Sequence, residues 1–185
     1  MQKIILVRHA HADWVPDNED RPLSAQGRAD AETLVPLLVE TAPDVLYSSP
    51  YARARQTIEP LAKALGLEIE EVAGLRERTL AAGAVDDFDA AMRASWEDFD
   101  LVHPGGESST AAQDRVFEAV SNLAARHPHE TVLMASHGNV LGLLMHRFDS
   151  SFGYEFWQSF TWPDVVRITL MSGGLSLVER LWNSA

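Results

Sequence analysis

Short apolar runs alternate with helical segments along this chain, and this alternation restricts its fold more than any other feature. The runs are rich in aliphatic and β-branched residues, which is typical of buried strands. We expect strands at residues 3–7, 44–47, 67–72, 130–135, 165–171 and 175–181, helices at 26–40, 51–65, 109–126 and 138–147, and an amphipathic segment at 86–99. This order predicts the α/β class, in a three-layer α/β/α arrangement whose mainly parallel sheet carries helices on both faces.

Local signals mark the ends of two of these helices. Ser24 is a suitable N-cap for the helix at 26–40, and Pro36 is expected to kink or interrupt that helix. Gly66 follows the next helix in the position of a C-cap.

The composition narrows the class of protein. The 185 residues are 46% hydrophobic, which suits one globular domain spanning residues 1–185. The chain has no cysteine, so disulfides, thiolate metal sites and cysteine nucleophiles are excluded within it. No window has the roughly 18 uninterrupted apolar residues of a membrane span, and the first apolar run stops at Arg8, too early for a signal peptide. We therefore expect a cytoplasmic protein with no membrane partner.

The net charge of −12 limits the partners further. A field of this sign repels nucleic acid and anionic membranes, so we expect no nucleic-acid partner. An anionic substrate would need a local cluster of basic residues. The positions of the arginines and histidines therefore matter more than their number.

Three of the predicted strands end in unusual polar groups. Arg8 and His9 follow the first strand, Ser48–Pro50 follows the second and leads into Arg53, and Ser136–Asn139 follows the fourth. Ligands of open α/β sheets bind beyond the carboxyl ends of the strands, so a parallel sheet would bring these groups together. Helix N-termini nearby add backbone N–H donors suited to phosphate. The pattern indicates chemistry on a phosphoryl group.

Each group also has a purely structural interpretation. Arg53 and Arg55 fit the solvated face of a helix, His137 followed by Gly138 fits a capping turn, and Glu77 fits an ordinary surface position. Only the set as a whole favours a site.

Several segments, in order, resemble the histidine phosphatase superfamily, also called the phosphoglycerate mutase-like family. The similarity runs from residue 4 to about residue 143, and the matching motifs are specific as a set. They are Leu6–Ala10, Leu23–Gly27, Ser48–Thr57, Leu75–Glu77, Pro104–Ser108 and Ser136–Gly138.

The resemblance implies a phosphoglycerate mutase-like fold and a set of roles. His9 would attack phosphorus and become a phosphohistidine. Arg8, Arg53 and His137 would hold the phosphoryl oxygens, with Gly138 also in the substrate-binding set. The product would be a dephosphorylated small metabolite.

The resemblance also implies that Glu77 protonates the leaving oxygen and then takes a proton from water. The family motif places Arg53 rather than Arg55 in the site. No metal and no other cofactor is expected, because the arginines and histidines supply the positive charge.

The chain departs from the mutase branch just after the nucleophile. Where mutases continue Arg-His-Gly-Glu-Ser/Thr-x-Trp-Asn, this chain keeps Trp14 but has Ala12 and Val15 in place of the hydroxyl residue and the Asn. The Gly-x-x-x-Gly pattern after the acid segment is absent, and Arg78–Ala81 follows instead. These differences favour a phosphatase over a mutase.

Two further residues are candidates for substrate binding. His11 either lines the pocket or is a solvated loop residue. Glu107 is either a second acid in the pocket or a residue that orders its loop. We expect the pocket walls to come from Thr79–Val102, whose acidic residues would disfavour multiply charged anions if they faced the site.

Alternative functions stay open. One is phosphoglycerate mutase-type phosphoryl transfer, and another is a protein phosphohistidine phosphatase, although that group tends to lack the Pro104–Ser108 loop. A third is a non-catalytic phosphate-binding module, which should have lost at least one of the key histidines and arginines. The oligomeric state is not predicted.

Overall fold

A computed structural model describes residues 2–13, 19–171 and 174–182. Six strands form one sheet in the order β3-β2-β4-β1-β5-β6. The strands are β1 (Gln2–Arg8), β2 (Val45–Ser48), β3 (Ile69–Glu71), β4 (Val132–Ser136), β5 (Asp164–Met171) and β6 (Gly174–Arg180). β3, β2, β4 and β1 pair in parallel, whereas β5 and β6 are added antiparallel. The predicted α/β class and the mainly parallel sheet are confirmed.

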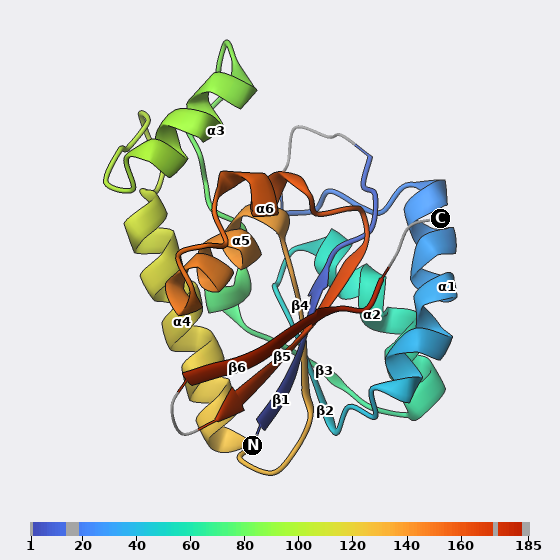
Figure 1. The fold of residues 1–185 in the computed structure, drawn as a ribbon. Coiled ribbons are helices and arrows are strands. Elements are labelled where there is room, and N and C mark those ends of the chain that lie inside the picture. Colours follow the sequence, from blue (N-terminus) through green and yellow to red (C-terminus); the bar gives the residue numbers. More distant parts are fainter. Residues whose placement is uncertain (1, 14–18, 172–173, 183–185) are drawn as a thin grey trace.

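Helices cover both faces of the sheet (Figure 1). α1 (Ala25–Glu40) and α2 (Ala52–Leu65) lie on one face, and α4 (Ser109–Arg126) and α5 (Gly138–Phe148) lie on the other. Each face has its own apolar core, built on alternate residues of the central strand: Ile5 and Val7 on the α1–α2 side, Ile4 and Leu6 on the α4–α5 side. This explains why β1 is an unbroken apolar run, since both of its faces are buried.

Two shorter helices lie near the carboxyl ends of the parallel strands (Figure 1). α3 (Phe88–Glu97) falls within the amphipathic segment, and α6 (Tyr154–Gln158) was not predicted. A single 3₁₀ turn, η1 (Ala73–Leu75), was not predicted either. No helix among the described residues is long and apolar enough to cross a membrane.

The capping signals are confirmed. Of the two effects expected of Pro36, an interruption of α1 is wrong, and a kink stays a prediction. The Ser24 side chain accepts a hydrogen bond from the Gly27 N–H, and Gly66 adopts a left-handed conformation with φ 67°. α1 nevertheless runs through Pro36. Pro36 is exposed, so water can replace the helical hydrogen bond that the proline removes.

Strand register brings the polar strand ends together. Arg8 at the end of β1 pairs with Ser136 at the end of β4, and Ser48 at the end of β2 pairs with Ala135. The backbone continues these ladders for one more residue: the His9 N–H donates to the Ser136 carbonyl at 3.0 Å. The groups that follow β1, β2 and β4 therefore share one edge of the sheet.

Candidate active site

Four of the predicted residues meet at this edge, and all four are buried. Arg8 and His9 come from the end of β1, Arg53 from the first turn of α2, and His137 from the residue that begins α5. The rings of the two histidines lie edge to face with centroids 5.2 Å apart. The structure thus gathers two imidazoles and two guanidinium groups from segments far apart in the sequence.

His9 presents one defined nitrogen to the site. Its Nδ1 lies 2.7 Å from the Ala10 carbonyl, and because a carbonyl only accepts, Nδ1 carries the proton. Nε2 is left with its lone pair, and the Arg53 Nε–H points at it from 3.2 Å. Burial, followed by the charge of Arg53, lowers the pKa of His9 well below its ordinary value. A neutral imidazole with a fixed tautomer is a competent nucleophile near pH 7.

Arg53 is held by the same helical turn that locates His9. The Arg53 carbonyl accepts from the Thr57 hydroxyl at 2.7 Å, and that hydroxyl in turn accepts from the Ala10 N–H at 3.0 Å. The Arg-Ala-x-x-Thr spacing places Arg53 and Thr57 on one face of α2, four residues apart. Burial lowers the pKa of Arg53 to about 10, so it stays charged at neutral pH.

Arg55 faces away from this group. It is 40% exposed and pairs with Glu59 and Glu71 at 3.3 and 2.7 Å. Of the two neighbouring arginines, only Arg53 reaches the histidines.

His137 is fully buried and has one unused ring nitrogen. Its Nε2 lies 2.7 Å from the Ser49 hydroxyl, while Nδ1 is buried without a hydrogen-bond partner in the described part of the chain. Burial first, and the charge of Arg53 second, lower the pKa of His137 well below its ordinary value. Buried polar atoms without partners are rare in folded proteins, and one beside His9 is suited to a ligand.

Arg8 crosses the N-terminus of α5 in close contact with Gly138. A Cβ at Gly138 would lie 2.7 Å from the Arg8 guanidinium carbon, so this approach requires glycine. The guanidinium donates to the Phe160 carbonyl at 2.8 Å and stacks on the Trp162 ring at 4.0 Å, while its Nε has no partner among the described residues. Burial lowers the pKa of Arg8 to about 10. The predicted substrate-binding Gly138 thus makes room for Arg8.

Glu77 reaches the same helix N-terminus. Its carboxylate accepts from the backbone N–H groups of Asn139 (3.1 Å) and Val140 (2.9 Å), in the first turn of α5. The preceding segment is held by the Ser136 hydroxyl, which donates to the Leu75 carbonyl at 2.7 Å. Glu77 therefore borders the group of histidines and arginines, as its motif predicted.

Glu107 forms ion pairs with two arginines, Arg76 and Arg115. Its carboxylate receives two hydrogen bonds from Arg115, at 2.9 and 2.7 Å. Burial alone would raise the pKa of Glu107, but the hydrogen bonds and charge of Arg115 lower it overall. Arg115 also donates to the Gly74 and Arg76 carbonyls at 2.8 and 3.0 Å. These contacts favour the second interpretation, in which Glu107 orders its surroundings, over a second acid in the pocket.

His11 is exposed and is a loop residue in this structure. Its Nδ1 lies 2.9 Å from the Ser24 hydroxyl, next to the start of α1. The same loop explains why residue 27 is a glycine. A Cβ at Gly27 would lie 2.0 Å from the His11 carbonyl oxygen, so no larger residue fits there.

Sequence reasoning missed three neighbours of the site and included a fourth, Asn139, only as the end of the polar group Ser136–Asn139. Asn139 has both side-chain polar atoms buried and unpartnered among the described residues. The Tyr51 ring lies under the Arg53 guanidinium, 4.9 Å away, and packs edge to face against the His137 ring. Trp162 covers Arg8, and the charge of Arg21 is close enough to lower the pKa of His9. Trp162 carries no local signal.

A cleft of about 350 Å³ opens beside Arg8 and Glu77. Part of its lining comes from the predicted segment Thr79–Val102, through residues of α3 and the loop before it. The opposite part comes from residues 157–162, which the sequence analysis did not implicate. Of the acidic residues in Thr79–Val102, Asp89 lines the cleft.

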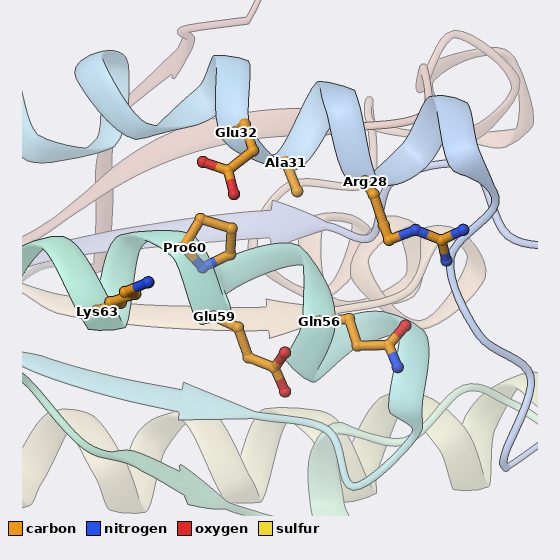
Figure 2. A pocket seen from close by; sticks show the side chains of 7 residues that line it. All are labelled: Arg28, Ala31, Glu32, Gln56, Glu59, Pro60 and Lys63. Carbon is orange, nitrogen blue, oxygen red and sulfur yellow. The ribbon is translucent and has the colours of Figure 1, made fainter.

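A separate hollow of about 370 Å³ lies between α1 and α2 (Figure 2). It contains none of the candidate site residues. Arg28 and Gln56 at one end hydrogen-bond the backbone of Leu23, which gives them a structural explanation. The lining residues are Arg28, Ala31, Glu32, Gln56, Glu59, Pro60 and Lys63.

Together, the fold and the cluster of histidines and arginines at the sheet edge define a class of protein. In this class of α/β proteins, histidines and arginines beyond the parallel strands hold an oxyanion next to a nucleophile. The chain belongs to the histidine phosphatase superfamily (branch 1), whose family model matches residues 4–180. The resemblance found in the motifs is thereby confirmed.

Individual relatives agree with this membership. Phosphoserine phosphatase 1 of Hydrogenobacter thermophilus is 32% identical over 150 residues, covering 74% of this chain and 71% of that protein. The solved structure of YhfR from Bacillus stearothermophilus is 28% identical with a TM-score of 0.77, over 96% of this chain and 95% of that one. A mycobacterial glucosyl-3-phosphoglycerate phosphatase with inorganic phosphate has a TM-score of 0.78 at 22% identity, covering 100% and 98% of the two chains. At that identity the likeness shows the fold alone.

Proposed function

We propose that this protein hydrolyses phosphomonoesters of small metabolites in two steps, through a phosphohistidine on His9. The observation that carries the proposal is the state of the His9 ring. Nδ1 is committed to the Ala10 carbonyl, and Nε2 faces a guanidinium that can hold a phosphoryl oxygen in attacking position.

In the first step the His9 Nε2 lone pair forms a bond to phosphorus, and the bond from phosphorus to the ester oxygen breaks. Glu77, entering as the carboxylic acid, gives its proton to the leaving oxygen. Arg8 and Arg53 stabilise the charge on the equatorial oxygens. The free nitrogen of His137 adds a donor once the negative charge of a phosphate raises the pKa of that imidazole.

In the second step water attacks the phosphohistidine. Its proton passes to the Glu77 carboxylate, the bond from Nε2 to phosphorus breaks, and orthophosphate leaves. His9 and the acid form of Glu77 are restored, so each turnover consumes one ester and one water.

The contacts of the site weigh against a non-catalytic binding module. Binding alone needs positive charge, but it does not need a neutral imidazole with a fixed tautomer next to a carboxyl group. The net charge of −12 further supports a small substrate held by local cations, in preference to nucleic acid. We place the activity in the cytoplasm, which the lack of cysteine supports.

Hydrolysis of 4-nitrophenyl phosphate by the wild type and by His9→Ala tests the proposal. We expect the substitution to lower kcat by about a thousandfold or more, and a chelator to leave the wild-type rate unchanged. Equal rates in the two proteins would overturn the proposal. Incubation with 3-phosphoglycerate tests the mutase alternative, because only a mutase converts it to 2-phosphoglycerate.

A further inference from the structure

We propose that the cleft beside Arg8 and Glu77 binds the alcohol part of the substrate, and that it selects bulky, apolar, ring-bearing alcohols without a carboxylate. The inference rests on the proposed function, because it states which phosphomonoesters that reaction takes. The cleft is continuous with the site, since Arg8, Glu77 and Asn139 belong to both. A leaving oxygen within reach of Glu77 therefore has its carbon skeleton at the mouth of this cleft.

The cleft walls are mostly apolar and partly aromatic. One wall comes from α3 and the loop before it, the other from the segment from α6 to β5, two parts of the chain that lie near each other in Figure 1. Flat side chains on the second wall suit a ring. The apolar lining consists of Leu80, Phe88, Met92, Trp157, Phe160 and Trp162.

Two of these side chains are unusually exposed. Phe88 is 54% and Trp162 is 53% accessible, and they belong to a group of only five large exposed hydrophobic residues in the described part of the chain. Two of the five thus flank one cleft next to the nucleophile. Clustered exposed apolar surface marks a place where a ligand is bound.

The residues that line the cleft leave no cation for a substrate carboxylate, and Arg21, whose charge acts on His9, is not among them. The two basic lining residues are Arg8 and Arg78, and the segments outside the described ranges contain no lysine or arginine. Arg78 is buried, and each of its three nitrogens makes a hydrogen bond within the protein: Nε to the Glu107 carbonyl (2.8 Å), and Nη1 and Nη2 to the hydroxyls of Ser109 and Ser95 (both 3.0 Å). Arg8 is already assigned to the phosphate.

A negative group along the cleft makes a carboxylate still less favourable. Asp89 lines the cleft, and Glu77, which also lines it, offers no positive charge. A carboxylate placed there would lose its hydration, gain no ion pair and face like charge. Esters that combine phosphate with carboxylate are therefore poor substrates, although the relative from Hydrogenobacter thermophilus is named for one of them.

Three esters separate these properties: benzyl phosphate, 4-carboxybenzyl phosphate and ethyl phosphate. Benzyl phosphate and its carboxylated analogue differ only at the far end of the ring, so their chemistry at phosphorus is closely matched. We expect kcat/KM of the wild type to be about tenfold or more higher for benzyl phosphate than for either of the other two.

Phe88 provides the variants, because an exposed residue at the start of α3 can be replaced without opening the core. Phe88→Ala should lower kcat/KM for benzyl phosphate more than for ethyl phosphate. Phe88→Arg should raise kcat/KM for 4-carboxybenzyl phosphate relative to benzyl phosphate. Leu177→Ala, which removes a similarly exposed side chain on β6, should leave all three values unchanged.

The outcomes distinguish this inference from the function on which it rests. If hydrolysis depends on His9 but kcat/KM is the same for 4-carboxybenzyl phosphate and benzyl phosphate, the inference is wrong and the phosphatase function stands. If no ester is cleaved, or cleavage survives His9→Ala, the function itself fails. The wild-type comparison decides the matter even if a Phe88 variant does not fold.

Discussion

The Nε of Arg53 lies 3.2 Å from the Nε2 of His9, which is the ring nitrogen left unprotonated by the hydrogen bond to Ala10. A positively charged guanidinium of the site therefore contacts the nucleophilic nitrogen directly. Burial first, and then the charge of Arg53, holds the pKa of His9 down. The same guanidinium is placed to hold a phosphoryl oxygen against the nitrogen that attacks it.

Arg53 and Arg55 make a matched pair for mutagenesis. Arg53→Lys keeps the charge but loses the planar fork, so we expect kcat/KM for 4-nitrophenyl phosphate to fall about a hundredfold. Arg55→Lys alters only exposed ion pairs and should change kcat/KM by less than about twofold. Comparable losses in the two variants would show that the site does not depend on Arg53.

The low pKa values of His9 and His137 predict a pH-dependent stability. Because burial and then Arg53 lower both values in the folded state, only the unfolded chain takes up these protons below about pH 6.5. Stability from this source is complete above that pH and is lost as the pH falls towards the folded pKa. Between about pH 7.5 and 5.5 the loss approaches about 1.4 kcal/mol for each histidine.

Urea unfolding at the two pH values measures this loss. His137→Asn should reduce the difference between the two free energies of unfolding by about 1.4 kcal/mol, the contribution of one buried histidine. His129→Asn is the control, because His129 is exposed. A difference that is the same in wild type and His137→Asn would contradict the burial argument.

Gly138→Ala should separate activity from stability. The added Cβ would lie 2.7 Å from the Arg8 guanidinium carbon, and the end of that side chain can move aside at low cost to the fold. We expect kcat/KM to fall about tenfold or more with a small change in Tm. Gly83→Ala is the control, since a Cβ there meets no atom within 4 Å. Full activity in Gly138→Ala would mean that the position of Arg8 is not critical.

Arg115 is expected to act through Glu77. It is fixed by Glu107 and holds the carbonyls of Gly74 and Arg76, directly before the acid. Arg115→Gln should therefore slow the hydrolysis of esters whose leaving oxygen needs a proton. We expect kcat/KM to fall about tenfold further for ethyl phosphate than for 4-nitrophenyl phosphate, whose leaving group departs without protonation. A structural role alone would lower both equally.

A second arginine of α4 serves as the control for this prediction. Arg126 makes an exposed ion pair with Glu70, at 3.5 Å, and its guanidinium carbon lies 5.8 Å from the centre of the Tyr47 ring. Arg126→Gln should leave kcat/KM unchanged for both ethyl phosphate and 4-nitrophenyl phosphate, and therefore also their ratio.

The parts of the site that follow buried strands could be predicted from the sequence. Arg8, His9 and His137 each follow a run whose burial fixes where the strand ends, and parallel pairing then brings those ends to one edge. The spacing of Arg53 and Thr57 on α2 is equally local. In each case a short stretch of sequence contains the whole signal.

The second wall of the cleft could not be predicted in this way. Phe160 binds Arg8 across 152 positions of sequence, and α6 has only five residues, too few for a periodic pattern. The role of Glu107 was left open for a related reason. Its carboxylate could face the pocket or Arg115, and only packed side chains decide between them.

The central claim is that His9 becomes phosphorylated during turnover. A quenched-flow experiment tests this claim directly. The enzyme is mixed with a ³²P-labelled ester and quenched rapidly without acid, and the protein is analysed by denaturing gel electrophoresis and peptide mapping. The account predicts a label on His9 that is stable in alkali and lost in acid, as expected for a phosphorus–nitrogen bond, and no label in His9→Ala. A label on another residue, or wild-type hydrolysis at full rate with no labelled protein at any time of quenching, would contradict it.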